Sequence, residues 1–261
     1  MKTVYYYQTF VGLDKLKSHV QDVDCIIISS LHCDKNGTSK QIYLNDDLPF
    51  NPKFTTMWEE TQLLAEQGVS ISLMIGGAGL AYGQLFEDFD IYYSQIRKLL
   101  QEKTFIRGID LDVEEGVTME QIQKLIRTLK QDFPYLTITM APLSGSMSSD
   151  SIGMGGFSYK QLSKTPEGKM ISRYHVQCYG SFSFDTFQSM VKNEWEPEQL
   201  VMGMMSGQFT PETFSNALQE VKKCYETYPT MGGVFDWEYL DAPPDEKDPS
   251  QWCSLMKQVT S

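Results

Sequence analysis

Three acidic residues, Asp110, Asp112 and Glu114, recur at every second position of one short segment, and the residues between them are apolar. On an extended strand such residues share one face, with neighbouring carboxylates about 6.6 Å apart along the chain. Carboxyl groups this close, with little solvent, cannot all ionise, because burial and like charge raise at least one pKa. The pattern therefore predicts a set that holds a proton near neutral pH. Glu114, the last of the three, is the expected general acid.

Two other interpretations of the three acids are open. One is a solvated strand face, which a strand covered by helices and interior to a barrel would not have. The other is a metal site, but the chain has only three histidines, of which only His32 and His175 lie in predicted strands. We therefore expect neither a metal ion nor a cofactor at this site.

Eight short β-rich segments could position these acids. They are residues 4–10, 25–32, 70–77, 106–114, 137–143, 174–180, 200–205 and 232–239. Between them lie segments of helical period, such as 90–102, 119–132 and 213–225. Strand and helix that alternate eight times indicate parallel strands joined by crossover helices.

We therefore predict an α/β fold, a single (β/α)8 TIM barrel that spans residues 1–261. An open doubly wound sheet is the alternative, but no Gly-x-Gly-x-x-Gly follows the first segment. In a barrel of this kind the chemistry lies at the C-terminal ends of the strands.

The composition excludes several classes of protein. Of the 261 residues, 41% are hydrophobic and 12% aromatic, which is enough for a large core and excludes disorder. A net charge of −12 argues against a nucleic-acid partner. No apolar run approaches the ~20 residues of a membrane helix, so we expect no membrane partner. We also expect the protein to be a monomer.

The first residues lack a signal peptide, and the five cysteines form no CxxC pair. The chain is therefore expected to be cytoplasmic or a mature secreted form whose leader was removed.

Several of these segments resemble the motifs of the family 18 glycoside hydrolases, the chitinase family. Residues 108–114 (GIDLDVE) resemble the D-x-x-D-x-D-x-E signature, and 74–77 (MIGG) resemble S-x-G-G. Residues 177–179 (QCY) resemble Q-x-Y, and 232–238 (GGVFDWE) resemble G-G-V-M-x-W-E of the last strand. The resemblance implies the same barrel.

Within the family, the chain is most similar to the fungal-type endo-β-N-acetylglucosaminidases rather than to chitinases with an inserted α+β domain. The stretches that carry this likeness are 43–47 followed by Trp58, 156–159, 174–182 and 237–239. The resemblance implies an N-glycan or another oligosaccharide that contains N-acetylglucosamine as the partner of the protein.

The resemblance also implies roles for individual residues. Family members use substrate assistance, in which the 2-acetamido oxygen of the sugar attacks its own anomeric carbon. Glu114 would then protonate the leaving oxygen, Asp112 would orient the acetamido group, Asp110 would share a proton with Asp112, and Tyr179 would hydrogen-bond the acetamido oxygen. The predicted substrate-binding residues are Gln177, Trp237 as the pocket floor, Tyr6 as a side wall, and Gly76, Gly77 and Met140.

Two positions depart from the family pattern. Arg107 stands where the first Asp of the signature is expected, but its parity differs from that of the acids, so it should face away from the interior. Met74 replaces the Ser of S-x-G-G. We expect this to remove a hydroxyl near Asp110 and to affect the pH optimum more than the activity.

Three functions fit these residues. The leading one is an endoglycosidase that cuts the β-1,4 bond between the two core N-acetylglucosamines of N-linked glycans. A chitinase would use the same catalytic residues, but a row of exposed Trp is typical of processive chitin hydrolysis and this chain has only four Trp. A silent sugar-binding protein would be expected to lack the acid Glu114. Residues 33–52 and 144–156 are the loops expected to set specificity.

Overall fold

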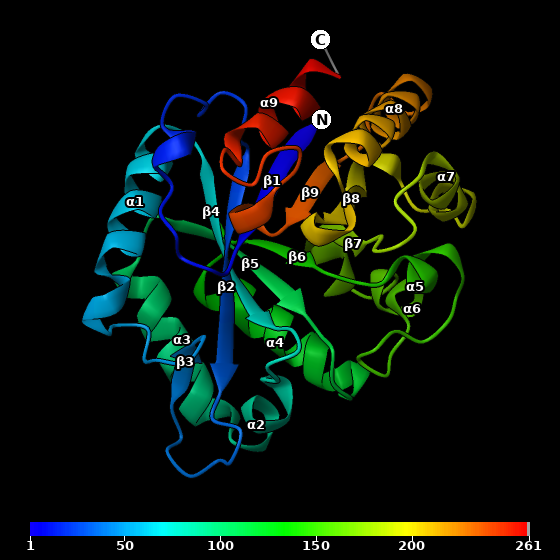
Figure 1. Cartoon of the computed structure of the whole chain (residues 1–261). Coiled ribbons are helices and arrows are strands. Elements are labelled where there is room, and N and C mark those ends of the chain that lie inside the picture. The colour runs from blue at the N-terminus through cyan, green and yellow to red at the C-terminus, as the bar shows by residue number, and fades with distance from the viewer. Residues whose placement is uncertain (260–261) are drawn as a thin grey trace.

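The computed structural model describes residues 1–259 and contains a closed barrel (Figure 1). All eight barrel strands run parallel to their neighbours, and the first pairs with both the second and the last, which closes the ring. The barrel strands are β1 (Lys2–Tyr7), β2 (Cys25–Cys33), β4 (Ser70–Gly76), β5 (Ile106–Asp112), β6 (Thr137–Met140), β7 (Ile171–Gln177), β8 (Leu200–Met205) and β9 (Gly233–Trp237). The predicted (β/α)8 barrel is confirmed.

A ninth strand, β3 (Ile42–Leu44), pairs antiparallel with the end of β2. Every strand of residues 1–259 thus belongs to one sheet, and no inserted α+β domain is present there.

Helices surround the barrel strands (Figure 1). The α-helices are α1 (Thr55–Glu66), α2 (Tyr82–Glu87), α3 (Phe89–Glu102), α4 (Met119–Asp132), α5 (Ser144–Ser148), α6 (Tyr159–Ser163), α7 (Phe184–Lys192), α8 (Pro211–Thr227) and α9 (Ser250–Gln258). Six short 3-10 helices complete the chain: Asp14–Leu16, Pro52–Phe54, Gly168–Met170, Pro197–Gln199, Ser206–Gln208 and Tyr239–Asp241. None of the described helices is long and apolar enough to cross a membrane.

Alternation along each strand divides the core into two layers, because successive side chains point to opposite faces. The inner layer fills the barrel and contains Val4, Tyr6, Ile27, Met74, Val201 and Phe235. The outer layer lies between strands and helices and includes Ile109 and Leu111 of β5. The apolar residues of β5 therefore pack outward, and its acids are left to face inward.

Strand ends differ from the predicted ones by up to three residues. β5 ends at Asp112, where its pairing with Gly76 of β4 ends, although the alternating pattern continues to Glu114. β7 begins at Ile171 because Ile171 already pairs with Ile138 of β6. Backbone pairing decides where a strand ends, and the alternation of apolar and polar side chains does not predict that end.

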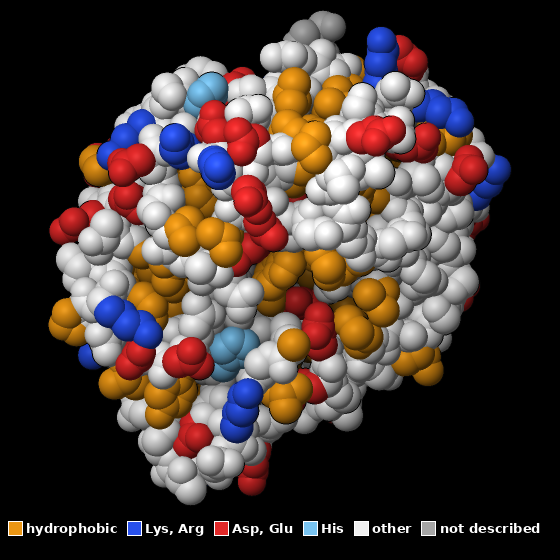
Figure 2. Space-filling model, viewed as in Figure 1, with side chains coloured by type: hydrophobic (Ala, Val, Ile, Leu, Met, Phe, Trp, Pro, Cys, Tyr) orange, Lys and Arg blue, Asp and Glu red, His pale blue; other side chains and the backbone are white. Residues whose placement is uncertain are grey.

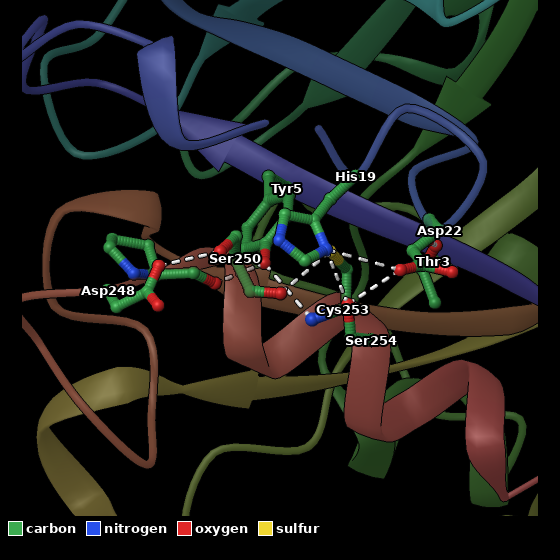
Figure 3. Close-up of polar contacts among 9 residues, drawn as sticks. Thr3, Tyr5, His19, Asp22, Asp248, Ser250, Cys253 and Ser254 are labelled. Carbon is green, nitrogen blue, oxygen red and sulfur yellow. Dashed lines mark hydrogen bonds and ion pairs between the residues drawn. The ribbon is translucent and has the colours of Figure 1, made fainter. Parts of the chain in front are cut away.

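The C-terminal helix α9 packs against β1 through a group of polar contacts (Figure 3). Tyr5 donates from its hydroxyl to the carbonyl of Pro249 at 2.5 Å and accepts from the backbone N–H of Cys253 at 3.1 Å. Ser254 donates to Asp22 at 2.6 Å. These contacts join the two ends of the chain. All five cysteines are free thiols.

Candidate active site

The three acids lie at the C-terminal end of β5. Asp110 is fully buried and Asp112 is 6% exposed, and both lie inside the barrel. Glu114 follows the strand, is partly exposed and lines a pocket at the barrel mouth. The acids therefore form a series from the barrel interior to the solvent.

Three side chains contact the Asp110 carboxylate. The Tyr6 hydroxyl donates to Oδ2 at 2.7 Å, and the Thr139 hydroxyl donates to Oδ1 at 2.5 Å. Nδ1 of His175 lies 3.3 Å from Oδ1. Asp110 is therefore held by two hydrogen bonds and lies close to one imidazole nitrogen.

Asp112 is in a different environment. Gln177 donates from Nε2 to Oδ1 of Asp112 at 3.2 Å and to the carbonyl of Ala141 at 2.9 Å. Burial raises the pKa of Asp112 well above its ordinary value, and the charges of Glu114 and Asp110 raise it further. Of the three acids, Asp112 is therefore the one whose environment favours a bound proton.

The pocket above these acids has a volume of about 410 Å³. Its lining contains Glu114, Asp112, Tyr179, Gln177, Trp237 and Gly77, all of which were predicted as site residues. Burial and the charge of Asp112 raise the pKa of the Tyr179 phenol well above its ordinary value, so it is a neutral hydrogen-bond donor at physiological pH. Near the middle of the face in Figure 2, acidic side chains are surrounded by hydrophobic ones.

Gly76 and Gly77 form the turn that follows β4, with φ of 103° and 77°. A Cβ on Gly77 would lie 3.3 Å from Oδ2 of Asp112 and 2.7 Å from Cε of Met74. Only glycine adopts this backbone conformation readily and leaves that space open. Gly77 therefore lines the pocket, whereas Gly76 does not: a Cβ there would meet the backbone of Asp112 and the ring of Tyr82.

Besides Gly76, two predicted substrate-binding residues do not line the pocket. Met140 is fully buried in the outer layer, because it pairs with outward-facing Leu111 while Thr139 takes the inward position. Tyr6 faces the interior as predicted, but it is 2% exposed and lies against the Trp237 ring at 5.3 Å. Tyr6 therefore supports Asp110 and Trp237 from within and is not a side wall.

Arg107 and Met74 are placed as their parity predicts. Arg107 is exposed, and its guanidinium lies over the ring of Tyr135 at 5.0 Å. Met74 faces inward, pairs in register with Asp110 and lines the pocket with Gly77. Met74 offers no hydroxyl there, which leaves the hydrogen bonds of Asp110 to Tyr6 and Thr139.

Several residues of the site were not predicted. Thr139 and His175 contact Asp110, while Gln8, Ser30 and Met205 help to line the pocket. Thr139 was detectable in part, since a polar residue inside an apolar strand needs an interior partner. The contact of His175 with Asp110 depends on the register between strands, for which one sequence has no signal.

A second cavity of about 670 Å³ adjoins the pocket and shares Gln8, His32 and Gly79 with it. Its other residues come from the ends of β1 and β2 and from the loop that carries β3; they are Thr9, Cys33, Asp34, Lys35, Tyr43, Asn45 and Asp46. The Glu238 carboxylate stabilises the segment after β1 by accepting hydrogen bonds from the backbone N–H groups of Gln8 and Thr9 at 2.6 and 2.9 Å. The site is therefore wider than one sugar-sized pocket.

Within residues 1–259, no group of three or more His, Cys, Asp or Glu side chains is arranged to hold a metal ion. No protein-family model matches the chain, and no curated protein matches it in sequence.

Solved structures match nearly the whole chain. A fungal endo-β-N-acetylglucosaminidase of glycosyl hydrolase family 18 is 28% identical with a TM-score of 0.87, covering 99% of this chain and 98% of its own. The chitinase ChiC of Aspergillus fumigatus is 28% identical with a TM-score of 0.84, covering 100% and 99%. A family 18 chitinase of Pseudoalteromonas aurantia shares the fold at 16% identity, with a TM-score of 0.74 over 99% and 100%.

The structures at 28% identity include both an endo-β-N-acetylglucosaminidase and a chitinase, and they support a family 18 hydrolase. The resemblance predicted from the motifs, to the family 18 glycoside hydrolases and within them to a fungal endo-β-N-acetylglucosaminidase, is therefore confirmed, and the chain has the fold of that hydrolase family.

Proposed function

We propose that the protein is an endo-β-N-acetylglucosaminidase, with residues 1–261 as one catalytic barrel, that cuts the β-1,4 bond of the N,N′-diacetylchitobiose core of N-glycans. One observation carries the hydrolase part of this proposal. Asp112, with a raised pKa, lies between ionisable Glu114 at the pocket surface and Asp110 in the interior. Such a series can hold a proton at neutral pH and use it in the reaction.

In the first step, Glu114 receives the proton held by Asp112 and gives it to the leaving glycosidic oxygen, as the bond from this oxygen to the anomeric carbon breaks. The 2-acetamido oxygen of the same sugar attacks the anomeric carbon and forms an oxazolinium ion. Asp112 orients the acetamido N–H, and the Tyr179 hydroxyl donates to the acetamido oxygen and holds it in line for attack. Positioned general acid catalysis contributes about 10²–10⁴-fold to the rate.

In the second step, Glu114 removes a proton from water, which attacks the anomeric carbon and opens the oxazolinium ring. Two displacements at one carbon retain the anomeric configuration. Trp237 supplies the apolar floor under the sugar, and Gln177 keeps Asp112 in place through its hydrogen bond.

We propose an N-glycan rather than chitin as the substrate because of the residues that line the site. Of the four Trp, only Trp237 lines the pocket, while Trp58, Trp195 and Trp252 are buried at 5%, 4% and 0% exposure. The chain therefore lacks the row of exposed Trp that is typical of processive chitin hydrolysis. The adjoining 670 Å³ cavity instead offers room for the branched end of a glycan.

The test is to incubate the protein separately with a high-mannose glycoprotein and with chitin oligosaccharides and to identify products by mass spectrometry. We expect the glycan to be released with one N-acetylglucosamine retained on Asn. Glu114→Gln should lower the rate by at least ~10²-fold, because it removes the transferable proton.

Glu120→Gln is the matched control, since Glu120 is exposed on α4 and its loss changes the charge equally. It should leave the rate unchanged. Cleavage of chitin alone would make the protein a chitinase. Sugar binding without cleavage of either substrate would favour a silent sugar-binding protein.

A further inference from the structure

His175 lies on β7 inside the barrel and is 4% exposed. Its Nδ1 has two oxygen neighbours, Oδ1 of Asp110 at 3.3 Å and the hydroxyl of Tyr6 at 3.2 Å. A buried imidazole in contact with a buried carboxylate is more than apolar core packing, and the mechanism described above does not use it.

The neighbours decide which atom carries the hydrogen between them. Tyr6 has one hydroxyl hydrogen and donates it to Oδ2 of Asp110 at 2.7 Å, so its oxygen can only accept. Oδ1 of Asp110 already accepts from Thr139 at 2.5 Å. Both neighbours of Nδ1 are therefore acceptors, and Nδ1 must carry a hydrogen.

We propose that His175 is a positioning residue whose Nδ1–H group stabilises negative charge on Asp110, so that the single proton of the buried pair stays on Asp112. Tyr6 and Thr139 donate hydrogen bonds to the carboxylate, and the Nδ1–H group of His175 lies between the Tyr6 oxygen and Oδ1 of Asp110. The proton on Asp112 lies next to Glu114 and the substrate, where the reaction can use it. This inference rests on the proposed hydrolysis and extends it.

The other groups around His175 do not replace it. The titratable groups in contact with it are Tyr6 of β1 and Asp110 of β5, and Asp110 in turn interacts with Cys25 of β2 and Asp112 of β5. Burial raises the pKa of Cys25 to about 11, so its thiol is neutral at physiological pH. The β8 and β9 neighbours Val201 and Phe235 are apolar. His175 is thus the one basic side chain in this group of described residues.

Loss of the Nδ1–H donor should make Asp110 a stronger base. The pair would then take up its second proton at higher pH, and with Asp110 neutral its charge no longer raises the pKa of Asp112. The acid limb of the pH profile of kcat/KM should therefore move to higher pH. Since His175 does not line the pocket, KM should change little.

The experiment compares His175→Leu with His175→Asn on whichever substrate the protein cleaves. An Asn amide can place an N–H near the position of Nδ1, whereas Leu cannot donate. For His175→Leu we expect the acid limb to move up by about one pH unit and kcat to fall roughly tenfold. For His175→Asn we expect a profile close to that of the unmodified protein.

A profile for His175→Leu that coincides with that of the unmodified protein would overturn the inference, as would an equal shift in both variants. Circular dichroism first establishes that each variant is folded. His19→Gln is the control for the loss of one histidine, since His19 lies at the α9 contact and not in the site.

A second measurement needs neither a folded Leu variant nor a substrate. Long-range proton–nitrogen NMR of the unmodified protein reports the tautomer of each of its three histidines, and His175→Asn identifies the signal. A protonated Nδ1 on His175 at neutral pH supports the inference, and a bare Nδ1 overturns it. If no substrate is cleaved, the proposed function fails while this measurement still decides the hydrogen bond.

Discussion

Asp236 is a further buried acid of this barrel, and its role differs from that of the acids on β5. Ser206 donates to its Oδ2 at 2.8 Å, while its Oδ1 has no hydrogen-bond partner among the described residues. Burial raises the pKa of Asp236 well above its ordinary value, against the opposing effect of the Ser206 hydrogen bond. The native state therefore holds a proton there that the unfolded chain loses above pH ~4.

This raised pKa predicts that the native state loses stability as pH rises from about 4 toward the folded-state value, since the folded form binds more protons in that window. In Asp236→Asn this component is absent. We expect the melting temperature of the variant relative to the unmodified protein to increase between pH 4 and pH 8, by ~2–4 °C for each kcal/mol. Thermal unfolding at both pH values measures it.

Glu246→Gln, a change at an exposed loop acid, provides the baseline and should show no such trend. A melting difference for Asp236→Asn that is the same at both pH values would contradict the prediction.

At the scale of elements, the turn after β4 connects the backbone to the catalytic acids. The N–H of Gly77 donates to the carbonyl of Asp112 at 2.9 Å, so the turn and the end of β5 are held together. Side chains at this turn would enter the space beside the Asp112 carboxylate.

Gly77→Ala should therefore reduce activity more than stability. The positive φ costs about 1–3 kcal/mol for a residue other than glycine, and the new methyl group would press on Asp112. We expect kcat to fall about tenfold or more with a melting temperature lower by a few degrees, measured by steady-state kinetics and thermal unfolding.

Gly145→Ala is the comparison, because Gly145 lies in α5 and a Cβ there meets nothing within 4 Å. Full activity in Gly77→Ala would show that the turn has room for a side chain and would refute this account of the pocket.

At the scale of the whole molecule, α9 returns the chain end to β1 and the β1–β2 connection. Ser254 donates to Asp22 and lies 2.9 Å from Nδ1 of His19, as Figure 3 shows. Lys257 adds a hydrogen bond to Asp24 at 2.6 Å. These contacts lie apart from the pocket residues, so they should affect stability and not catalysis.

Ser254→Ala should cost about 1 kcal/mol through the lost hydrogen bond, which lowers the melting temperature by ~2–4 °C in a chain of this size. Activity at 25 °C should be unchanged. Ser94→Ala removes only a contact within α3, to the carbonyl of Ile91, and should lower the melting temperature less than Ser254→Ala does. Equal melting temperatures for the two variants would refute a role for α9 in joining the chain ends.

The sequence alone determined the face on which the residues of β5 lie. The two-residue period placed Asp110 and Asp112 inside the barrel and Arg107 outside. The eightfold alternation of strand and helix determined the barrel, since parallel neighbours require crossovers. The amphipathic segment 119–132 matched α4 residue for residue, because Thr118 and Gln121 form a capping box at its start.

Only the tertiary structure decided how the strands are aligned with one another. Register between strands depends on pairing around the whole closed ring, and local spacing contains no record of it. That register turns Thr139 inward and Met140 outward, and it brings Tyr6, from the start of the chain, and His175 to Asp110. The catalytic residues could therefore be recognised from the sequence. The side chains that contact Asp110 from other strands could be identified only from the tertiary structure.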